Sequence, residues 1–318
     1  MPEFALIDRI RAATRMDAPA VRLGIGDDAA LIDCPPGQVL VAAVDTLNEG
    51  VHFPAGTAPA DLGHKALAVN LSDLAAMGAA PAACLLALSL PEADDAWVDA
   101  FARGLGALAR RHGAPLAGGD TVSGPLSVTV TALGFVGPGE ALRRDAARPG
   151  DLVCVSGALG AAALGLARWR RGEPLGAGPE AALHRPEPRV ALGRALRGLA
   201  HAAIDLSDGL ASDLGHVLRA SGCGARIDLA ALPAAPDLAA LDPEERWGMQ
   251  VSGGDDYELC FTVRPGRLDA VRAAARDVAV PVTVIGEVRE GEGVEFIRPG
   301  GGAWRPAGAG FEHFGAAS

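Results

Sequence analysis

Several features that mark other protein classes are missing from this chain of 318 residues, and each absence excludes a class. Gly, Asp or Pro interrupts every apolar stretch well before the roughly 20 residues that a membrane-spanning helix needs, so we expect no membrane segment. Lys and Arg number 28 against 39 Asp and Glu, which gives a formal net charge of −11. An acidic chain gains nothing from releasing nucleic-acid counterions, so DNA and RNA are not expected partners.

Cysteine is scarce as well. The five cysteines lack a C-x-x-C pair and the spacing of a disulfide framework. Most lie in apolar runs such as Leu152-Val153-Cys154-Val155, where cysteine acts as a small buried hydrophobe. The first residues, Met1-Pro2-Glu3-Phe4, lack the basic region and apolar block of a secretory signal peptide. These observations favour a reducing, cytoplasmic compartment.

The common nucleotide-binding motifs are absent too. The chain contains no G-x-x-x-x-G-K-[ST] segment, which excludes a P-loop, and no protein-kinase catalytic loop. A nucleotide site in this chain must therefore depend on metal ions and backbone amides rather than on a Walker lysine.

What the chain has instead is aspartate at turn-like, often glycine-flanked positions along its length. The segments are Gly26-Asp27-Asp28, Asp45-Thr46, Ser72-Asp73, Gly118-Gly119-Asp120, Asp205-Leu206-Ser207-Asp208-Gly209 and Gly253-Gly254-Asp255-Asp256. Magnesium keeps several waters and takes one or two carboxylates, so many aspartates favour several ions shared with the phosphates of a substrate. The pattern predicts phosphoryl transfer from a nucleotide.

Asp73 lies in a segment that predicts a buried helix, residues 61–77. Apolar residues occupy nearly every face of this segment, which is typical of a buried helix. We therefore expect Asp73 to be buried, where a carboxylate must be neutralised, paired or bound to metal. Lys65, in the same helix, is most simply a solvated residue.

The other motifs leave structural interpretations open. Gly-Asp pairs commonly form turns through Asx hydrogen bonds, and Asp208 could simply cap the helix that follows it. Arg143 and Arg144 could be a solvated pair or a clamp for ATP phosphates. Gly157 and Gly160 could form only a strand-to-helix turn, or an anion site at a helix N-terminus.

Helical and strand patterns alternate in both halves, without the rhythm of a Rossmann fold. We expect helices at 8–15, 61–77, 97–108, 161–171, 188–199, 210–218 and 267–278, and strands at 39–44, 84–90, 127–136, 152–155, 203–204, 260–263 and 282–285. Segments rich in Gly and Pro at 137–139 and 148–150 frame a connector. The sequence thus predicts two α+β domains, 1–137 and 148–318, with the active site in the cleft between them.

Taken in order, the motifs resemble one family. They read Gly24-Ile-Gly-Asp-Asp-Ala, Asp45-Thr-Leu-Asn-Glu-Gly-Val-His-Phe53, Lys65-Ala-Leu-Ala-Val-Asn-Leu-Ser-Asp-Leu-Ala-Ala-Met-Gly78, Gly118-Gly-Asp-Thr121, Ile204-Asp-Leu-Ser-Asp-Gly-Leu210 and Ser252-Gly-Gly-Asp-Asp-Tyr-Glu-Leu259. This set closely resembles the thiamine-monophosphate kinases of the aminoimidazole-ribonucleotide-synthetase-like superfamily, across nearly the whole chain. The resemblance implies that superfamily's mixed α/β fold, a homodimer whose N-terminal sheets pair, and ATP-dependent phosphorylation of thiamine monophosphate to thiamine diphosphate. It also implies direct in-line transfer with several magnesium ions.

The same resemblance implies roles for individual residues. The implied magnesium ligands are Asp28, Asp45, Asp73, Asp120, Asp205 and Asp208, with Asp73 and Asp120 the most critical. The implied ATP contacts are Gly119, Asp120, Arg144 and Ser207, and the implied contacts to thiamine monophosphate are His52, Asp255 and Phe311. The chain departs from the family at Asp255, where glutamate is usual, and at Val44, where relatives often carry a hydroxyl side chain.

The expected reaction joins two polyanions, so charge repulsion is the main obstacle and metal ions with alignment supply most of the catalysis. The acceptor phosphate has its second pKa near about 6 and is largely ionised at neutral pH, so it needs no strong general base. Three alternatives stay open. They are another ATP-using enzyme of the superfamily, such as an aminoimidazole ribonucleotide synthetase, a metal-dependent phosphohydrolase, and a non-catalytic binder of nucleotide or thiamine.

Overall fold

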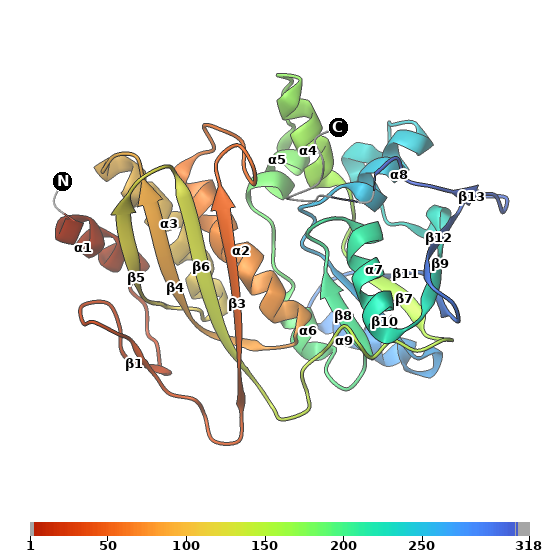
Figure 1. Ribbon diagram of the computed structural model, residues 1–318, viewed down its shortest axis with the longest axis horizontal. Coiled ribbons are helices and arrows are strands. Elements are labelled where there is room, and N and C mark those ends of the chain that lie inside the picture. The colour runs from red at the N-terminus through yellow and green to blue at the C-terminus, as the bar shows by residue number, and fades with distance from the viewer. Residues whose placement is uncertain (1–2, 309, 311–318) are drawn as a thin grey trace. The chain divides into compact units, whose positions relative to one another are not determined.

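The computed structural model describes residues 3–308 and 310. The chain divides into two compact units (Figure 1). The first comprises residues 1–74 and 79–139, and the second comprises residues 75–78 and 140–318. Within the described residues, no helix combines the length and the apolar character that crossing a membrane would require.

The first unit is built on a four-stranded sheet with the strand order β3-β6-β4-β5. Strand β6 pairs antiparallel with β3 and β4, and β5 runs parallel to β4. The strands are β3 (Val39–Asn48), β4 (Ala80–Leu90), β5 (Leu116–Ser123) and β6 (Ser127–Val136). A short hairpin, β1 (Val21–Leu23) with β2 (Leu31–Ile32), precedes the sheet in the chain.

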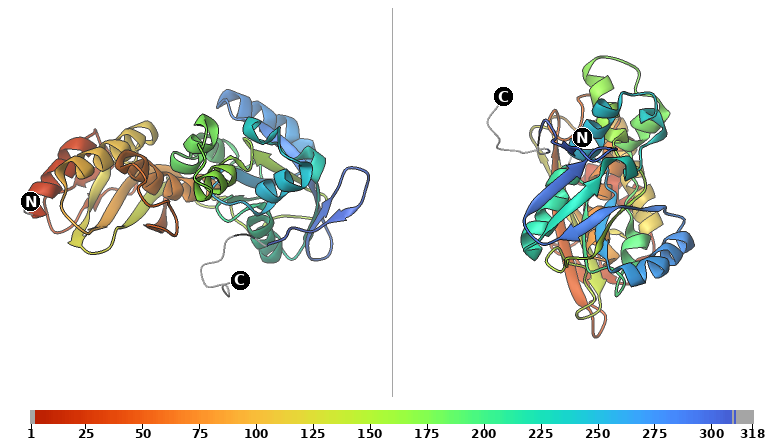
Figure 2. Two further views of the ribbon diagram at one scale, coloured as in Figure 1. Left: turned by 90° about the horizontal axis from the view of Figure 1, so that it is seen from above. Right: turned by 90° about the vertical axis from the view of Figure 1, so that its right-hand side faces the viewer.

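Helices α1 (Glu3–Thr14), α2 (Pro59–Ala76) and α3 (Asp95–His112) cover one face of this sheet (Figure 2). Two glycines allow α2 and α3 to pack closely. A Cβ atom at Gly63 would lie 2.1 Å from the carbonyl oxygen of Phe101, and one at Gly104 would lie 1.9 Å from that of Ala60. Any larger residue at either position would push the two helices apart.

The sheet residues alternate between this helical layer and an open face. Val128, Val130 and Ala132 of β6 are fully buried under the helices, as the alternating pattern of the strand predicts. On the edge strands β3 and β5, by contrast, Val44 is 60% exposed and Val122 is 51% exposed. Apolar side chains thus remain uncovered on the face that carries no helix in the described part of this unit.

The second unit contains a seven-stranded sheet with the order β13-β12-β9-β11-β7-β10-β8. Neighbouring strands are antiparallel except for β9 and β12, which run parallel. The strands are β7 (Leu152–Ser156), β8 (Ala202–Asp205), β9 (Gly224–Asp228), β10 (Leu259–Val263), β11 (Val282–Arg289), β12 (Gly293–Ile297) and β13 (Ala303–Trp304).

Helices flank both faces of the second sheet, with α7 and α9 on opposite sides (Figure 2). The helices are α4 (Ala161–Arg170), α5 (Ala177–His184), α6 (Val190–Ala195), α7 (Leu210–Ser221), α8 (Pro243–Ser252) and α9 (Leu268–Asp277), with single 3-10 turns η1 (Leu229–Ala231), η2 (Pro236–Leu238) and η3 (Pro265–Arg267). Leu214 and Leu218 of α7 pack with Val153 and Val155 of β7 in the core of this unit. Helix α7 ends at Ser221, and Gly222 after it caps the helix in a left-handed conformation, φ 68°.

Three expectations about local structure are wrong. Strand β3 continues to Asn48, so Asp45 lies within the strand rather than at its end. The Gly118-Gly119-Asp120 segment lies inside β5 and forms no turn. The helix expected at 188–199 is only Val190–Ala195, because the chain turns at Gly198 with φ 70°.

Candidate active site

In the first unit, the backbone of Asp45 is fixed to helix α2. Its N–H group donates to Oδ1 of Asn70 at 3.0 Å, and Nδ2 of Asn70 donates to the carbonyl oxygen of Ala66 at 3.0 Å. Asn70 is completely buried, so its amide has no competing water. These two hydrogen bonds hold β3 against α2 at Asp45, which the family resemblance implies to be a metal ligand.

Asp73 is half-buried, so the expectation of a buried carboxylate is wrong. Its neighbours Ser72 and Leu74 are both fully buried, as expected for a helix that is covered nearly all round. Asp73 and Met77 lie one turn apart, and both keep part of their surface exposed. A carboxylate at such a half-buried position retains some hydration, which lowers the cost of its charge.

Lys65 is 1% exposed, which corrects its interpretation as a solvated residue. Its Nζ donates to the carbonyl oxygen of His52 at 3.2 Å. Nδ1 of His52 accepts a hydrogen bond from the N–H group of Asn48 at 2.9 Å. The neutral imidazole must therefore carry its proton on Nε2, which suits that nitrogen for donation to an anionic ligand.

Asp28 and Asp120 are both exposed. The N–H group of Asp28 donates to Oδ1 of Asp27 at 2.8 Å, which is the turn interaction that the Gly-Asp pair suggests. Oδ1 of Asp120 accepts from the N–H group of Thr121 at 2.9 Å. Gly119 needs to be glycine, because a Cβ atom there would lie 1.8 Å from the carbonyl oxygen of Leu86.

In the second unit, two acidic motifs lie side by side. Asp205 is buried at the end of β8, where it pairs with Leu259 of β10. Beyond the strand, the N–H group of Asp255 donates to the carbonyl oxygen of Ser207 at 2.9 Å, and that of Tyr257 donates to Leu206 at 2.8 Å. The segment 205–209 is therefore clamped to the segment 253–258 by backbone hydrogen bonds.

Asp208 does not cap helix α7. The residue before the helix is Gly209, and the capping oxygen comes from inside the helix. Oδ2 of Asp213 accepts from the N–H groups of Asp208 and Gly209, at 3.0 and 3.1 Å. Burial raises the pKa of Asp213 to about 7, with the negative charges of Asp208 and Asp205 adding to the shift. Three carboxylates are thus crowded at this strand end, and a bound cation would relieve their repulsion.

Asp256 supplies the anion at the N-terminus of α4. Its Oδ1 and Oδ2 accept from the N–H group of Gly160 at 2.9 and 3.2 Å. Burial raises the pKa of Asp256 well above its usual value, against the opposing effect of the Gly160 hydrogen bond. The helix N-terminus is therefore engaged by the protein's own side chain, which favours the structural interpretation of the glycines at 157 and 160.

Glu258 is likewise engaged inside the protein. Its Oε2 accepts from Oγ of Ser156 at 2.5 Å and from Nε of Arg189 at 2.7 Å, and a second guanidinium nitrogen of Arg189 bonds Oε1. Gly157 lies against this carboxylate, and a Cβ atom there would lie 1.8 Å from Oε1. Glu258 therefore anchors the acidic motif to β7 and to the start of α6.

The two arginines of the connector differ. Arg143 pairs with Asp145, Nε to Oδ1 at 2.8 Å and Nη2 to Oδ2 at 2.5 Å. Arg144 is exposed and has no acidic partner among residues 3–308 and 310. Its carbonyl oxygen accepts from Oγ of Ser221 at 2.9 Å. The structure thus leaves Arg144, and not Arg143, available for an anion.

The predicted metal ligands belong to both units. Asp28, Asp45, Asp73 and Asp120 lie in the first unit, and Asp205 and Asp208 lie in the second. In the part of the chain that the structure describes, no three His, Cys, Asp or Glu side chains form a ready-made metal cage. Phe311 lies outside the described residues.

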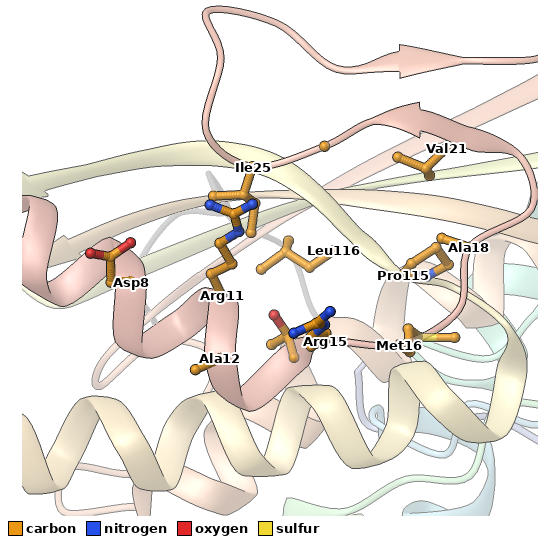
Figure 3. Close-up of a pocket in the computed structure, with 12 residues that line it drawn as sticks. Asp8, Arg11, Ala12, Arg15, Met16, Ala18, Val21, Ile25, Pro115 and Leu116 are labelled. Atoms are coloured by element: carbon orange, nitrogen blue, oxygen red, sulfur yellow. The ribbon is translucent and has the colours of Figure 1, made fainter.

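A pocket of about 460 Å³ lies in the first unit, between α1, the segment that follows it and the start of β5 (Figure 3). Arg11 of α1 and Arg15, which follows the helix, reach into it, and Ile25 and Leu116 form apolar walls. None of the predicted metal ligands lines it, although Ile25 directly precedes the Gly26-Asp27-Asp28 motif. This pocket is therefore separate from the acidic residues described above.

Comparison with known proteins places the chain in a family. Models for the N-terminal and C-terminal domains of AIR synthase related proteins match residues 26–136 and 148–298. The thiamine-monophosphate kinase of Escherichia coli strain K12 is 48% identical over 322 aligned residues, which cover 98% of each chain. The crystal structure of thiamine-monophosphate kinase from Stenotrophomonas maltophilia K279a is 50% identical, covers 93% of this chain and 96% of that one, and has a TM-score of 0.87. This chain belongs to the thiamine-monophosphate kinase family.

More distant structures agree with this assignment. A structure described as AaThiL complexed with AMPPCP and TMP is 30% identical, covers 95% of this chain and 96% of that one, and has a TM-score of 0.75. The hydrogenase maturation protein HypE of Escherichia coli is 22% identical, with a TM-score of 0.78, and shares the fold alone. The mixed α/β fold expected from the sequence is thereby confirmed.

The residues that sequence reasoning missed in this kinase are those that hold the motifs in place. Asn70 lies inside the most specific motif but was not singled out, because amides in helices have many roles. Asp213 lies in a helix without a flanking glycine, and its hydrogen bonds to the N–H groups of Asp208 and Gly209 follow no capping pattern that the sequence shows. Arg189 is 69 residues from its partner Glu258, and no local pattern links two such positions.

Proposed function

We propose that this kinase transfers the γ-phosphoryl group of ATP directly and in line to thiamine monophosphate, assisted by magnesium ions that its aspartates hold. The overall reaction is that of its family, the ATP-dependent phosphorylation of thiamine monophosphate in thiamine diphosphate biosynthesis. One observation carries the proposal. The chain is 48% identical to a thiamine-monophosphate kinase across 98% of both lengths.

The chemistry of the acidic residues fits magnesium. Asp28, Asp45, Asp73, Asp120, Asp205 and Asp208 offer the hard oxygen ligands that this ion prefers. Burial raises the pKa of Asp213, and the negative charges of Asp208 and Asp205 raise it further, which supports a cation at the end of β8. Magnesium usually keeps waters and shares substrate phosphates, so a protein site without a complete cage suits it. When bound, the ions would offset the negative charge of both reactants.

The ATP contacts that we propose are Gly119, Asp120, Arg144 and Ser207. Arg144 is exposed and without an acidic partner in residues 3–308 and 310, and its guanidinium geometry matches phosphate oxygens. Gly119 is exposed on β5, so its backbone is open to a ligand. Ser207 lies between Asp205 and Asp208, in the loop that the hydrogen bond from Asp255 holds.

The acceptor contacts that we propose are His52, Asp255 and Phe311. His52 is oriented by Asn48 so that its Nε2 can donate to a phosphate oxygen. A carboxylate would repel the phosphate, whereas thiamine carries a cationic thiazolium ring that a carboxylate attracts. We therefore assign Asp255 to the organic, cationic part of the acceptor and His52 to its phosphate.

These residues bind and align; none of them needs to remove a proton. The acceptor oxygen is already ionised at neutral pH, so no strong general base is required. The buried Lys65 and Asn70 hold the His52 loop and strand β3 against α2, and the clamp between segments 205–209 and 253–258 holds the second acidic group. Preorganised alignment of this kind can supply a large part of the rate enhancement.

A product assay tests the reaction. The purified chain is incubated with ATP, magnesium chloride and thiamine monophosphate, and thiamine diphosphate and free phosphate are measured separately. Thiamine diphosphate in equal amount to ADP supports the kinase. Free phosphate without thiamine diphosphate would identify a phosphohydrolase instead, and the absence of both products would identify a binding protein.

The stereochemistry of the transferred phosphorus tests the in-line step. With ATP that is chiral at the γ-phosphorus, one direct transfer inverts the configuration. A phosphoenzyme intermediate adds a second transfer and retains the configuration. Retention would therefore refute the direct mechanism while leaving the overall reaction intact.

We also propose a homodimer in which the open face of the N-terminal sheet pairs with a second copy. Val44 and Val122 are more than half exposed on the two edge strands of that face, and uncovered apolar surface of this kind favours association. Long unprotected edge strands such as β3 also pair readily with another chain.

We place the enzyme in the cytoplasm, because Cys84, Cys154 and Cys260 are buried free thiols.

A further inference from the structure

Tyr257 is the single tyrosine of the chain, and it contacts Asp255 directly. The phenol Oη donates a hydrogen bond to Oδ1 of Asp255 at 3.0 Å. Tyr257 is 7% exposed, so its hydroxyl needs a partner within the protein. We propose that Tyr257 is a positioning residue that fixes the direction of the Asp255 carboxylate toward the acceptor. This inference rests on the proposed role of Asp255 in binding thiamine monophosphate.

The backbone around this pair is strained and held in place. Asp255 has φ 67° and Tyr257 has φ 47°, both in the left-handed region that non-glycine residues rarely occupy. Such conformations persist only where the surrounding structure fixes them, and they gather at functional sites. Here the N–H group of Asp255 is bonded to Ser207 at 2.9 Å and that of Tyr257 to Leu206 at 2.8 Å.

The neighbouring side chains fix the same loop from two further directions. Asp256 accepts from the N–H group of Gly160 at the start of α4. Glu258 is bonded by Ser156 and by Arg189. The backbone of the loop is held on both sides, and the Tyr257 hydroxyl restrains rotation of the Asp255 side chain.

This restraint is important for an acidic side chain as short as that of aspartate. Glutamate has one more methylene and can adjust its reach by rotating an additional bond. The Asp255 side chain has one rotatable bond fewer. The direction of its carboxylate therefore depends on the backbone conformation and on the hydrogen bond that the carboxylate accepts. The hydrogen bond from Tyr257 therefore matters more for a short side chain than for a long one.

Tyr257→Phe is the direct test, because it removes the hydroxyl and keeps the ring. We expect the KM for thiamine monophosphate to rise about tenfold, which is the loss of one hydrogen bond to a charged group. The KM for ATP should stay unchanged. An equal rise in both constants, or no rise in either, would overturn the proposal.

A double mutant tests whether Tyr257 affects the KM for thiamine monophosphate through Asp255. Asp255→Ala should raise the KM for thiamine monophosphate by itself, and adding Tyr257→Phe to it should cause no further rise, because Tyr257 acts through that carboxylate. Additive effects of the two changes would show that Tyr257 acts independently of Asp255, and the proposal would fail.

Trp304→Phe is the matched control. Trp304 is also a buried aromatic donor in the second unit, and its Nε1 donates to Oε2 of Glu244 at 2.7 Å. Its replacement removes the same kind of hydrogen bond away from the acidic motif. We expect both KM values to stay unchanged in this variant. A rise in the KM for thiamine monophosphate equal to that of Tyr257→Phe would mean that general loosening of the unit explains the effect.

The single tyrosine also provides a readout that needs no turnover and no variant of Tyr257 itself. Labelling tyrosine with ¹³C at the ring carbon that bears the hydroxyl gives one NMR resonance. We expect Asp255→Asn to shift that resonance, and thiamine monophosphate without ATP to shift it in the unaltered chain. A resonance that responds to neither change would refute the proposal. If the resonance responds but the chain makes no thiamine diphosphate, the proposed function fails while the Tyr257–Asp255 contact stands.

Discussion

Replacing Arg189 by methionine tests how firmly the second unit holds its acidic motif. The Arg189 side chain is 23% exposed and that of its partner Glu258 is 6% exposed. The change keeps much of the aliphatic volume and leaves the Glu258 charge buried with only the Ser156 hydroxyl as donor. Breaking a buried ion pair in this way costs about 3–5 kcal/mol, and we expect about 3 because some water reaches Arg189.

A thermal melt measures this loss. For a folding unit of this size, about 3 kcal/mol corresponds to a fall in Tm of about 6–12 °C. The matched control is Arg171→Met, which breaks an exposed pair with Glu173, Nε to Oε1 at 2.8 Å, whose side chains are 50% and 47% exposed. Such an exposed pair contributes little to stability, so the control should melt close to the unaltered chain.

A second variant distinguishes two causes of the fall in Tm: the lost attraction between Arg189 and Glu258, and the unpaired Glu258 charge left buried. In the double variant Arg189→Met with Glu258→Gln no charge remains at the site, and Ser156 can still donate to the side-chain oxygen. We expect the double variant to recover most of the lost Tm. If it melts no higher than Arg189→Met alone, or if Arg171→Met lowers Tm equally, the reasoning about a buried charge is refuted.

Three further predictions follow from the proposed metal site and dimer. Asp73→Asn should abolish turnover with an unchanged circular dichroism spectrum, because the amide cannot replace a carboxylate ligand; a near-normal rate would remove Asp73 from the metal site. Exhaustive chelation with EDTA should abolish thiamine diphosphate formation, and magnesium should restore it; full activity after chelation contradicts the metal proposal. Val44→Lys should shift the protein to monomers in sedimentation velocity, because a charge on the open sheet face disfavours pairing; an undisturbed dimer would place the interface elsewhere.

The sequence predicts best the helices and strands whose own apolar residues recur with a clear period. Strand β6 occupies residues 127–136 as predicted, because its alternate residues are buried along its whole length. Helix α8 was missed although its signal is local. Asp242 caps it by accepting from the N–H group of Glu244 at 2.9 Å, and Pro243 follows at the first helical position. Strands β9, β12 and β13 have no such local signal, because these segments become strands by pairing with neighbouring strands of the sheet.

Helix α2 shows why burial is harder to predict than helicity. Its sequence is apolar on nearly all sides, so periodicity cannot tell which stripe packs most tightly. The structure buries Lys65 and leaves Asp73 half-exposed, the reverse of the two predictions made from the sequence. Lys65 can be buried because its ammonium group meets the carbonyl oxygen of His52, in a loop that lies before the helix in the chain. That partner is a tertiary contact, which the pattern of α2 alone does not contain.

The segment 253–258 shows why a count of carboxylates overstates the number of metal ligands. Of its three acidic side chains, Asp256 is bonded to a helix N-terminus and Glu258 to an arginine, so both hold the loop together. Asp255 accepts a hydrogen bond from the Tyr257 phenol, and the role we propose for it is to attract the cationic part of the acceptor. Asp256 and Glu258 therefore build the site, whereas we assign Asp255 to the substrate. The hydrogen-bond donor that each carboxylate contacts indicates this difference better than its position in the motif does.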